Sequence, residues 1–304
     1  MKQQRIFDPD VQSLVNEVEL GDSTRITKGR KPDPYDFDLS QWREYENILT
    51  DSLWLLGKRD SSGVHTGSYH GNFVPQIAQQ AILRFSRPGD VVVDAFVGSG
   101  TTLIECQRMG RIGIGIELNP IIAGESQERV ERERRAGNRP QHLVIGDTCL
   151  ITTWEKVRTQ MREYDKHLSP LVILHPPYHN IIKFSDLPGD LSSLATVEDF
   201  LSLFSTSVAN AAPCISNGGH LVLVVGDIYA NSEWVPLGFR CMQAVLDWAG
   251  DKKSKFVLKG ICVKDIQDNR AKRNQEKLWR YRALAGGYYI FKHEYIMFFR
   301  KARR

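Results

Sequence analysis

The fold is decided by residues 91–102, Val-Val-Val-Asp-Ala-Phe-Val-Gly-Ser-Gly-Thr-Thr. Val91–Asp94 is a short β-branched run that is typical of a buried strand, and the segment 101–109 behind it has a helical pattern. Between them, Gly98 and Gly100 allow the backbone to turn tightly and to approach a ligand without a Cβ in the way. A strand, a glycine turn and a helix in this order indicate one unit of an α/β sheet that binds a ligand at its strand ends.

The same alternation of short β-branched runs and longer helical patterns continues to the C-terminus. Strands that read as continuous apolar runs, separated by helices, predict a mostly parallel sheet covered on both faces. No helical pattern separates the last two runs, so we expect these strands to form an antiparallel hairpin at the sheet edge. The seven expected strands lie at 91–94, 112–117, 142–145, 171–174, 220–225, 256–263 and 288–300, and the expected helices lie at 101–109, 120–135, 152–164, 197–212 and 236–248.

The first 65 residues differ from this pattern. A helix is predicted over 40–56, where five apolar residues recur at spacings of 3, 4, 4 and 3: Trp42, Tyr45, Leu49, Leu53 and Leu56. The glycine- and serine-rich stretch 57–68 ends it. We therefore expect a partly helical N-terminal extension over 1–65, with a further short helix at 11–20, and an α/β domain over 66–304.

Composition narrows the class of protein. A chain of 304 residues with 41% hydrophobic and 25% charged residues is typical of one large globular domain, or of one domain with an appendage. Five widely spaced cysteines without a C-x-x-C pair argue against a disulfide framework and against a zinc site. No apolar run approaches the roughly 20 residues that span a bilayer, and no secretion signal is seen, so a cytoplasmic location is expected.

Positive charge is concentrated in one segment. Residues 252–292 hold twelve Lys or Arg against three acidic residues, a net +9, which leaves −5 for the rest of a chain whose net charge is +4. A basic stripe on an otherwise acidic chain indicates a polyanionic partner. The alternative is a solvated surface without a partner.

Carboxylates follow the next two expected strands. Glu117 lies 23 residues beyond Asp94, at the end of the second strand, where a carboxylate can accept hydrogen bonds from ribose hydroxyls. Asp147 ends the third strand and can either bind the exocyclic amine of an adenine or cap the helix that follows. The loop lacks G-K-[ST] and departs from G-x-G-x-x-G, so it is neither a P-loop nor the dinucleotide fingerprint. The glycine turn and the acids together indicate a cofactor that contains a nucleoside.

A second constellation, His175-Pro176-Pro177-Tyr178, follows the fourth expected strand. Two prolines fix the backbone and remove two N–H donors, so nearby carbonyls can accept hydrogen bonds from a planar amino group. Tyr178 can stack on the ring that carries that amine. Pro-Pro alone favours a rigid turn, but ligands bind at the C-terminal ends of strands in open α/β sheets, and this corner lies there.

Together these segments resemble the amino-group DNA methyltransferases, which methylate N6 of adenine or N4 of cytosine. In that family the cofactor loop reads F-x-G-x-G and the catalytic corner reads [DNS]-P-P-[YFW]; residues 96–100 and 175–178 match them. The resemblance covers about residues 66–304, and the further matching segments are 69–75 before the first strand, 225–228 and 235–238 around the fifth, and 293–301 in the last.

This resemblance implies the Rossmann-like class I methyltransferase fold, S-adenosyl-L-methionine as the methyl donor, and no metal. It implies that the four corner residues His175, Pro176, Pro177 and Tyr178 are catalytic. The cofactor-binding residues that it implies are Tyr69, His70, Asn72, Phe73, Asp94, Ala95, Phe96, Gly98, Ser99, Gly100, Thr101, Thr102, Glu117, Leu118, Asn119 and Asp147.

One corner residue departs from the family pattern. His175 stands where the family has Asp, Asn or Ser, which supply a hydrogen-bond acceptor for the target amine. A neutral imidazole can accept one hydrogen bond, in the correct tautomer. The choice between adenine and cytosine therefore stays open. His179 and Asn180 either assist the corner or are surface turn residues.

The basic segment interleaves charge with aromatics, as in Trp279 and Tyr281, and such a segment can hold phosphates and stack on bases. Core packing is the alternative for these two rings. The candidate nucleic-acid-binding residues are Lys264, Arg270, Lys272, Arg273, Lys277, Arg280 and Arg282.

The expected function is site-specific methylation of adenine N6 or cytosine N4 in DNA, with DNA as the partner and no membrane association. A homodimer or a restriction-modification partner is compatible with it. The alternatives are methylation of an RNA base, methylation of a glutamine amide in a protein, and a catalytically inactive DNA-binding homologue.

Overall fold

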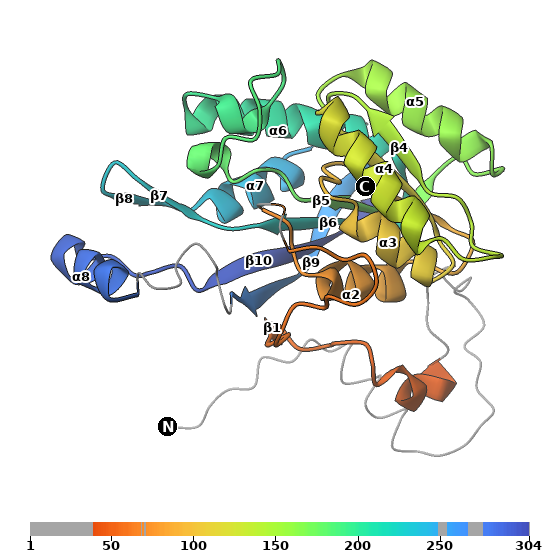
Figure 1. Cartoon of the computed structure of the whole chain (residues 1–304), viewed down its shortest axis with the longest axis horizontal. Coiled ribbons are helices and arrows are strands. Elements are labelled where there is room, and N and C mark those ends of the chain that lie inside the picture. Colours follow the sequence, from red (N-terminus) through yellow and green to blue (C-terminus); the bar gives the residue numbers. More distant parts are fainter. Residues whose placement is uncertain (1–38, 68, 70, 249–253, 267–275, 304) are drawn as a thin grey trace. The chain divides into compact units, whose positions relative to one another are not determined.

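A sheet of eight strands runs through the part of the chain that this computed structural model describes, which is residues 39–303 without 68, 70, 249–253 and 267–275 (Figure 1). The strand order is β1-β9-β10-β6-β5-β2-β3-β4. The strands are β1 (Leu53–Trp54), β2 (Val91–Asp94), β3 (Ile112–Glu117), β4 (His142–Ile145), β5 (Ser169–Leu174), β6 (Ile215–Val225), β9 (Ser254–Asp265) and β10 (His293–Arg303), and β7 (Ile228–Ala230) pairs with β8 (Glu233–Val235) in a separate hairpin.

The sheet confirms the predicted fold class. All seven expected strands are present, and the neighbours β4-β3-β2-β5-β6 run parallel. The expected antiparallel pair is β9 with β10, and β10 also pairs antiparallel with β6, so β10 lies inside the sheet and not at its edge. This is the Rossmann-like arrangement of an α/β domain with a reversed last strand.

Both faces of the sheet are covered by helices (Figure 1). Neighbouring residues of a strand point to opposite faces, and on β2 Val91 and Val93 pack in one core while Val92 packs in another. The first core includes residues of α5 (Ile151–Arg162), α6 (Val197–Ala211) and α7 (Leu237–Leu246), and the opposite face carries α2 (Pro75–Phe85), α3 (Thr101–Arg108) and α4 (Pro120–Glu133). Since both faces are buried, the strands contain few polar residues.

Helix α2 was not predicted, although its pattern is regular. Pro75 stands at the first helical position, and the buried residues Ile77, Ala78, Ala81 and Ile82 recur at helical spacing. The helix directly precedes β2 and packs against α3.

The predicted helix over 40–56 is wrong. Residues Leu39–Tyr45 form a 3-10 helix, η1, and Leu53–Trp54 form strand β1, which pairs parallel with β9. Trp54, which the helical stripe omitted, is 3% exposed, whereas Leu53 is 59% exposed. Pairing with β9 and burial of Trp54 outweigh local helical periodicity. The short helix expected at 11–20 lies outside the described residues.

The prediction that no helix lies between the last two strands is also wrong. Helix α8 (Glu276–Gly286) stands between β9 and β10 in the chain (Figure 1). Most of its described side chains are exposed, so it has no apolar stripe that a periodicity search could find. In the described part of the chain, none of the helices has the length and apolar character needed to span a membrane.

Candidate active site

A cavity of about 840 Å³ opens where the strand order reverses. From β2 the chain proceeds through β3 and β4 in one direction and then through β5 and β6 in the other. Ligands bind in open α/β sheets in the crevice at this switch point. Residues that follow β2, β3, β4 and β5 line the cavity, so its position follows from the fold.

The glycine loop after β2 forms one wall. Gly98 and Gly100 have positive φ angles, +50° and +85°, which glycine adopts without steric cost. Gly100 is the N-cap residue of α3, and no side chain caps this helix. The Ser99 hydroxyl is buried and has no hydrogen-bond partner among the described residues, so the loop presents an unsatisfied polar atom beside the cavity.

Asp94 lies beneath this loop and not in the cavity wall. Its carboxylate accepts hydrogen bonds from the Phe96 N–H, at 3.0 Å, and from the Thr102 hydroxyl. The side chain is 1% exposed, and burial raises its pKa to about 6. Asp94 therefore ties the start of the loop to the start of α3.

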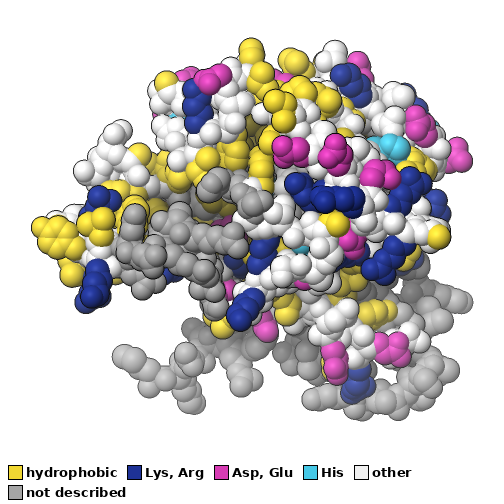
Figure 2. All heavy atoms as spheres, viewed as in Figure 1, with side chains coloured by type: hydrophobic (Ala, Val, Ile, Leu, Met, Phe, Trp, Pro, Cys, Tyr) yellow, Lys and Arg dark blue, Asp and Glu magenta, His cyan; other side chains and the backbone are white. Residues whose placement is uncertain are grey.

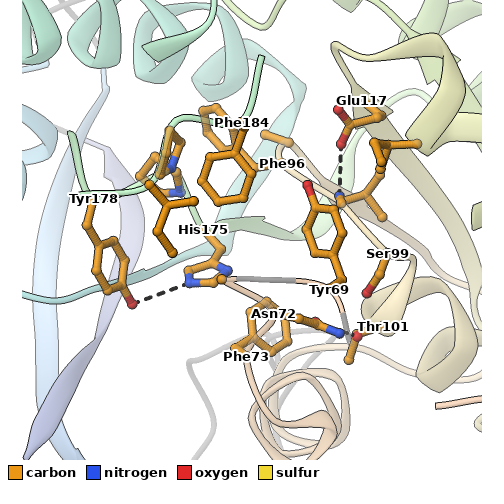
Figure 3. Close-up of a pocket in the computed structure, with 18 of the residues that line it drawn as sticks. Tyr69, Asn72, Phe73, Phe96, Ser99, Thr101, Glu117, His175, Tyr178 and Phe184 are labelled. Carbon is orange, nitrogen blue, oxygen red and sulfur yellow. Dashed lines mark hydrogen bonds between the residues drawn. The ribbon is translucent and has the colours of Figure 1, made fainter. Parts of the chain in front are cut away.

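Glu117 reaches the loop from the end of β3 (Figure 3). Its Oε2 accepts a hydrogen bond from the Gly98 N–H at 3.1 Å, and its Oε1 accepts one from the Asn119 N–H at 2.9 Å. Burial raises the pKa of this carboxyl, and the backbone hydrogen bonds oppose that rise. The backbone N–H of Leu118 also contributes a hydrogen bond to this carboxylate, and the remaining acceptor capacity can serve a ligand hydroxyl.

Asp147 follows β4 and lines the same cavity. Its Oδ1 accepts a hydrogen bond from the Cys149 N–H at 2.7 Å, which stabilises the turn before α5. The N-cap residue of α5 is Leu150, so Asp147 is not the helix cap. Its second oxygen lies beside Gly189, which lines the same cavity.

Segment 69–75 crosses the glycine loop. Thr101 donates a hydrogen bond to Asn72 Oδ1 at 2.8 Å, and Arg59 holds the Asn72 and Phe73 carbonyls at 3.0 and 2.9 Å. The Tyr69 ring lies against Gly98 (Figure 3). These contacts close the cavity on the side of α2.

The Pro-Pro corner follows β5 and forms the opposite wall. The Pro177 carbonyl accepts a hydrogen bond from the His179 N–H at 2.9 Å, and His179 has a left-handed φ of +50°. In the described part of the chain, no hydrogen bond reaches the Pro176 carbonyl. That carbonyl is available to a ligand amine.

His175 is enclosed by aromatic rings. Its centroid lies 4.9 Å from Phe73 and 5.7 Å from Tyr178, edge-on to both. Its Nε2 is 3.3 Å from the Tyr178 hydroxyl. Burial lowers the pKa of His175 to about 4, so the imidazole is neutral at physiological pH.

Comparison with known proteins finds relatives of the region around the glycine loop. A family model described as DNA methylase matches residues 22–128. This match includes the glycine loop and Glu117, and the curated relatives that the chain resembles include DNA methyltransferases. The chain is 43% identical over 114 residues to the type II methyltransferase M.SmaI of Serratia marcescens, which is 36% of this chain and 37% of that protein.

Two further type II methyltransferases are similar. The identity to M.Cfr9I of Citrobacter freundii is 33% over 112 residues, or 36% of this chain and 35% of that protein. The identity to M.MjaII of Methanocaldococcus jannaschii is 43% over 87 residues, or 26% of this chain and 16% of that protein. The matched stretch thus spans little more than a third of these relatives at most.

Most of the residues that the sequence singles out line this cavity. Besides the four corner residues, they are Tyr69, Asn72, Phe73, Ala95, Phe96, Gly98, Ser99, Thr101, Glu117, Leu118, Asn119 and Asp147. Asp94, Gly100 and Thr102 support the loop from behind and do not line the cavity. His70 lies outside the described residues. Of the two neighbours of the corner, His179 is buried and Asn180 is exposed.

The basic residues fall into three groups. Lys264 lines the cavity and pairs with Glu294, with Nζ 3.3 Å from Oε1. The side chains of Lys277, Arg280 and Arg282 on α8 are exposed. Arg270, Lys272 and Arg273 lie outside the described residues.

The cavity-lining residues that were missed include Arg59, Phe184, Asp190 and Glu294. Phe184 packs on Tyr69 with ring centroids 6.0 Å apart, and buried Asp190 binds the hydroxyls of Ser185 and Ser192. The sequence offers a signal only for Glu294, because a lone carboxylate in an otherwise apolar strand requires a buried partner.

Proposed function

We propose that this chain is a site-specific DNA methyltransferase that transfers a methyl group from S-adenosyl-L-methionine to the exocyclic amine of adenine (N6) or cytosine (N4). The observation that carries the proposal is one continuous cavity with the glycine loop and Glu117 at one end and the His175–Tyr178 corner at the other (Figure 3). A cofactor and a flipped base can therefore meet in it.

The loop end fits a nucleoside cofactor. Ser99 supplies a buried hydroxyl without a partner, and Gly98 leaves space that a Cβ would fill. Glu117 would accept hydrogen bonds from ribose hydroxyls, and Asp147 would accept one from the adenine amine. S-adenosyl-L-methionine supplies an electrophilic methyl group when it is bound.

The corner end fits a planar amine. The free Pro176 carbonyl and His175 would each accept one amino hydrogen, which turns the nitrogen lone pair out of conjugation with the ring. Tyr178 would stack on the base. No nucleophile or base catalyst is required, because positioning supplies most of the rate acceleration.

The exposed basic residues of α8 support DNA as the polymer. Its Lys277, Arg280 and Arg282 would hold phosphates while the target base enters the cavity. This charge also disfavours a protein substrate. The match of residues 22–128 to a family model described as DNA methylase supports the same choice.

Incubation with methyl-labelled S-adenosyl-L-methionine tests the proposal. Unmodified duplex DNA, total RNA and a protein extract would be offered separately, and the products would be hydrolysed and separated. We expect label only in DNA, in N6-methyladenine or N4-methylcytosine. Label in RNA or in glutamine would replace this function with one of the alternatives. Cofactor and DNA binding without any transfer would identify an inactive homologue.

A further inference from the structure

A chain of polar contacts leads from His175 away from the cofactor end of the cavity. The Tyr178 hydroxyl lies 3.3 Å from His175 Nε2 and donates a hydrogen bond to Glu294 Oε2 at 3.0 Å. The second oxygen of Glu294 lies 3.3 Å from Lys264 Nζ. Glu294 and Lys264 are directly opposite each other on β10 and β9, and they are 8% and 7% exposed.

The Lys264–Glu294 pair fixes where the hydroxyl hydrogen of Tyr178 goes. In this buried ion pair the Glu294 carboxylate only accepts hydrogen bonds, one oxygen facing Lys264 and the other facing Tyr178. Tyr178 has one hydroxyl hydrogen, and it points to Glu294. Its oxygen can therefore only accept a hydrogen bond from His175.

His175 must then carry its hydrogen on Nε2. A neutral imidazole has one N–H and one lone pair, so Nδ1 is left as the acceptor. Nδ1 lies on the side of the ring away from Tyr178 (Figure 3), and in the described part of the chain it has no hydrogen-bond partner. It is also not among the buried polar atoms without a partner, so it faces the cavity.

We propose that Glu294 and Lys264 are positioning residues that act through Tyr178 to hold His175 in the tautomer protonated on Nε2, so that Nδ1 accepts one amino hydrogen of the target base. This inference rests on the proposed function for its substrate. It explains how a histidine can stand at a corner position where the family has Asp, Asn or Ser.

Replacing Glu294 with Gln should reverse the tautomer. The amide oxygen of Gln would turn to Lys264, because the amide NH₂ cannot face an ammonium group. The NH₂ would then donate to the Tyr178 oxygen, and the hydroxyl hydrogen would point to His175 Nε2. The imidazole hydrogen would move to Nδ1, which could no longer accept the amine.

The test is ¹⁵N NMR of the histidine side chains in the full chain, with His175 assigned by comparison with His175→Asn. We expect a lone-pair shift at Nδ1 and an N–H shift at Nε2 in the wild type, and the reverse in Glu294→Gln. Tyr178→Phe, which keeps the Lys264–Glu294 pair and the ring, should give a mixture of both tautomers. A wild-type hydrogen on Nδ1, or an unchanged pattern in Glu294→Gln, would overturn the inference.

Kinetics provide the second readout. Glu294→Gln should lower the single-turnover rate of methyl transfer about tenfold or more, because one hydrogen bond to the reacting group is lost. The Kd for the cofactor should stay unchanged. The same substitution would be made in a His175→Asp background, because a carboxylate has no tautomer to set. There Glu294→Gln should lower the rate of methyl transfer far less. An equal loss of rate in both backgrounds would show a merely structural role. The NMR experiment needs no substrate, so its result does not depend on the proposed function. A wild-type protein that methylates no DNA would contradict the proposed function without changing the tautomer measured for His175.

Discussion

The Tyr69 ring lies so close to Gly98 that a Cβ built on Gly98 would come 3.0 Å from Tyr69 Cε1. Gly98 also has a φ of +50°, which other residues rarely adopt. The cavity wall at this point thus depends on a glycine for two independent reasons, its backbone conformation and the missing side chain.

Gly98→Ala should weaken cofactor binding. A left-handed alanine costs about 1–2 kcal/mol, and the Cβ would also displace Tyr69, so we expect a loss in affinity of about tenfold or more by titration calorimetry. The matched control is Gly124→Ala in α4, where a Cβ has nothing within 4 Å and φ is not positive. The control should bind normally; normal binding by Gly98→Ala as well would show that the loop does not contact the cofactor.

Asp94 should make the free energy of unfolding fall as pH rises. Burial raises its pKa in the folded chain to about 6, from 3.8 as the ordinary value. Between about pH 4 and pH 6 the folded chain therefore holds a proton that the unfolded chain has released, so stability declines through this window and is level above it. The shift corresponds to about 3 kcal/mol.

Asp94→Asn should remove this decline, because an amide of the same shape has no proton to lose. Urea unfolding at pH 4.5 and pH 7 would measure the difference, with the exposed carboxylate variant Asp51→Asn as the control. The same pH dependence in Asp94→Asn and in the wild type would contradict the expected burial cost.

The sheet could be predicted from the sequence because its strands are buried on both faces. Runs such as Val91–Asp94 and Leu171–Leu174 have no exposed face and therefore contain almost no polar residues. The helical periodicity of residues 40–56 led to a wrong prediction. Leu53–Trp54 pair with β9, more than 200 residues away in the sequence, and this pairing decides the structure of the segment. Helix α8 was missed for the opposite reason, because its exposed side chains leave no apolar stripe.

The residues of the candidate site likewise include some that the sequence could predict and some that it could not. The glycine loop, Glu117 and the Pro-Pro corner could be found because each follows a recognisable strand. The role of Glu294 depends on a cross-strand partner and on Tyr178, 116 residues away in the sequence, so only the fold brings them together. Lys264 was assigned to DNA contact from its charge, whereas the structure places it in the cavity beside Glu294.

Tyr178→Ala should separate catalysis from cofactor binding. Loss of an aromatic platform for a base costs about 1–3 kcal/mol, so we expect methyl transfer to fall about tenfold to a hundredfold. Tyr178 lies at the end of the cavity away from Glu117 (Figure 3), so the Kd for the cofactor should stay within about twofold of the wild-type value. Tyr164→Ala removes a half-buried ring beside His142 at the far edge of the sheet and should leave transfer intact. Equal transfer by Tyr178→Ala and the wild type would exclude Tyr178 as the platform.

The basic residues of α8 should set the salt dependence of DNA binding. Lys277, Arg280 and Arg282 are exposed on α8, and Figure 2 shows individual Lys and Arg side chains there among hydrophobic ones. Each phosphate contact contributes about 0.9 to the slope of log K against log salt, so replacing all three with Gln should reduce the slope by up to about 2.7.

Fluorescence anisotropy with a labelled duplex, over a range of salt concentrations, would measure that slope. The control changes the same amount of charge elsewhere, with Gln at Arg132, Lys156 and Arg162, which are exposed on α4 and α5 at the other end of the sheet. If net charge alone governed binding, both triple variants would lose affinity equally. A contact at α8 predicts a reduced slope only for its own variant, and an unchanged slope there would place the DNA on another surface.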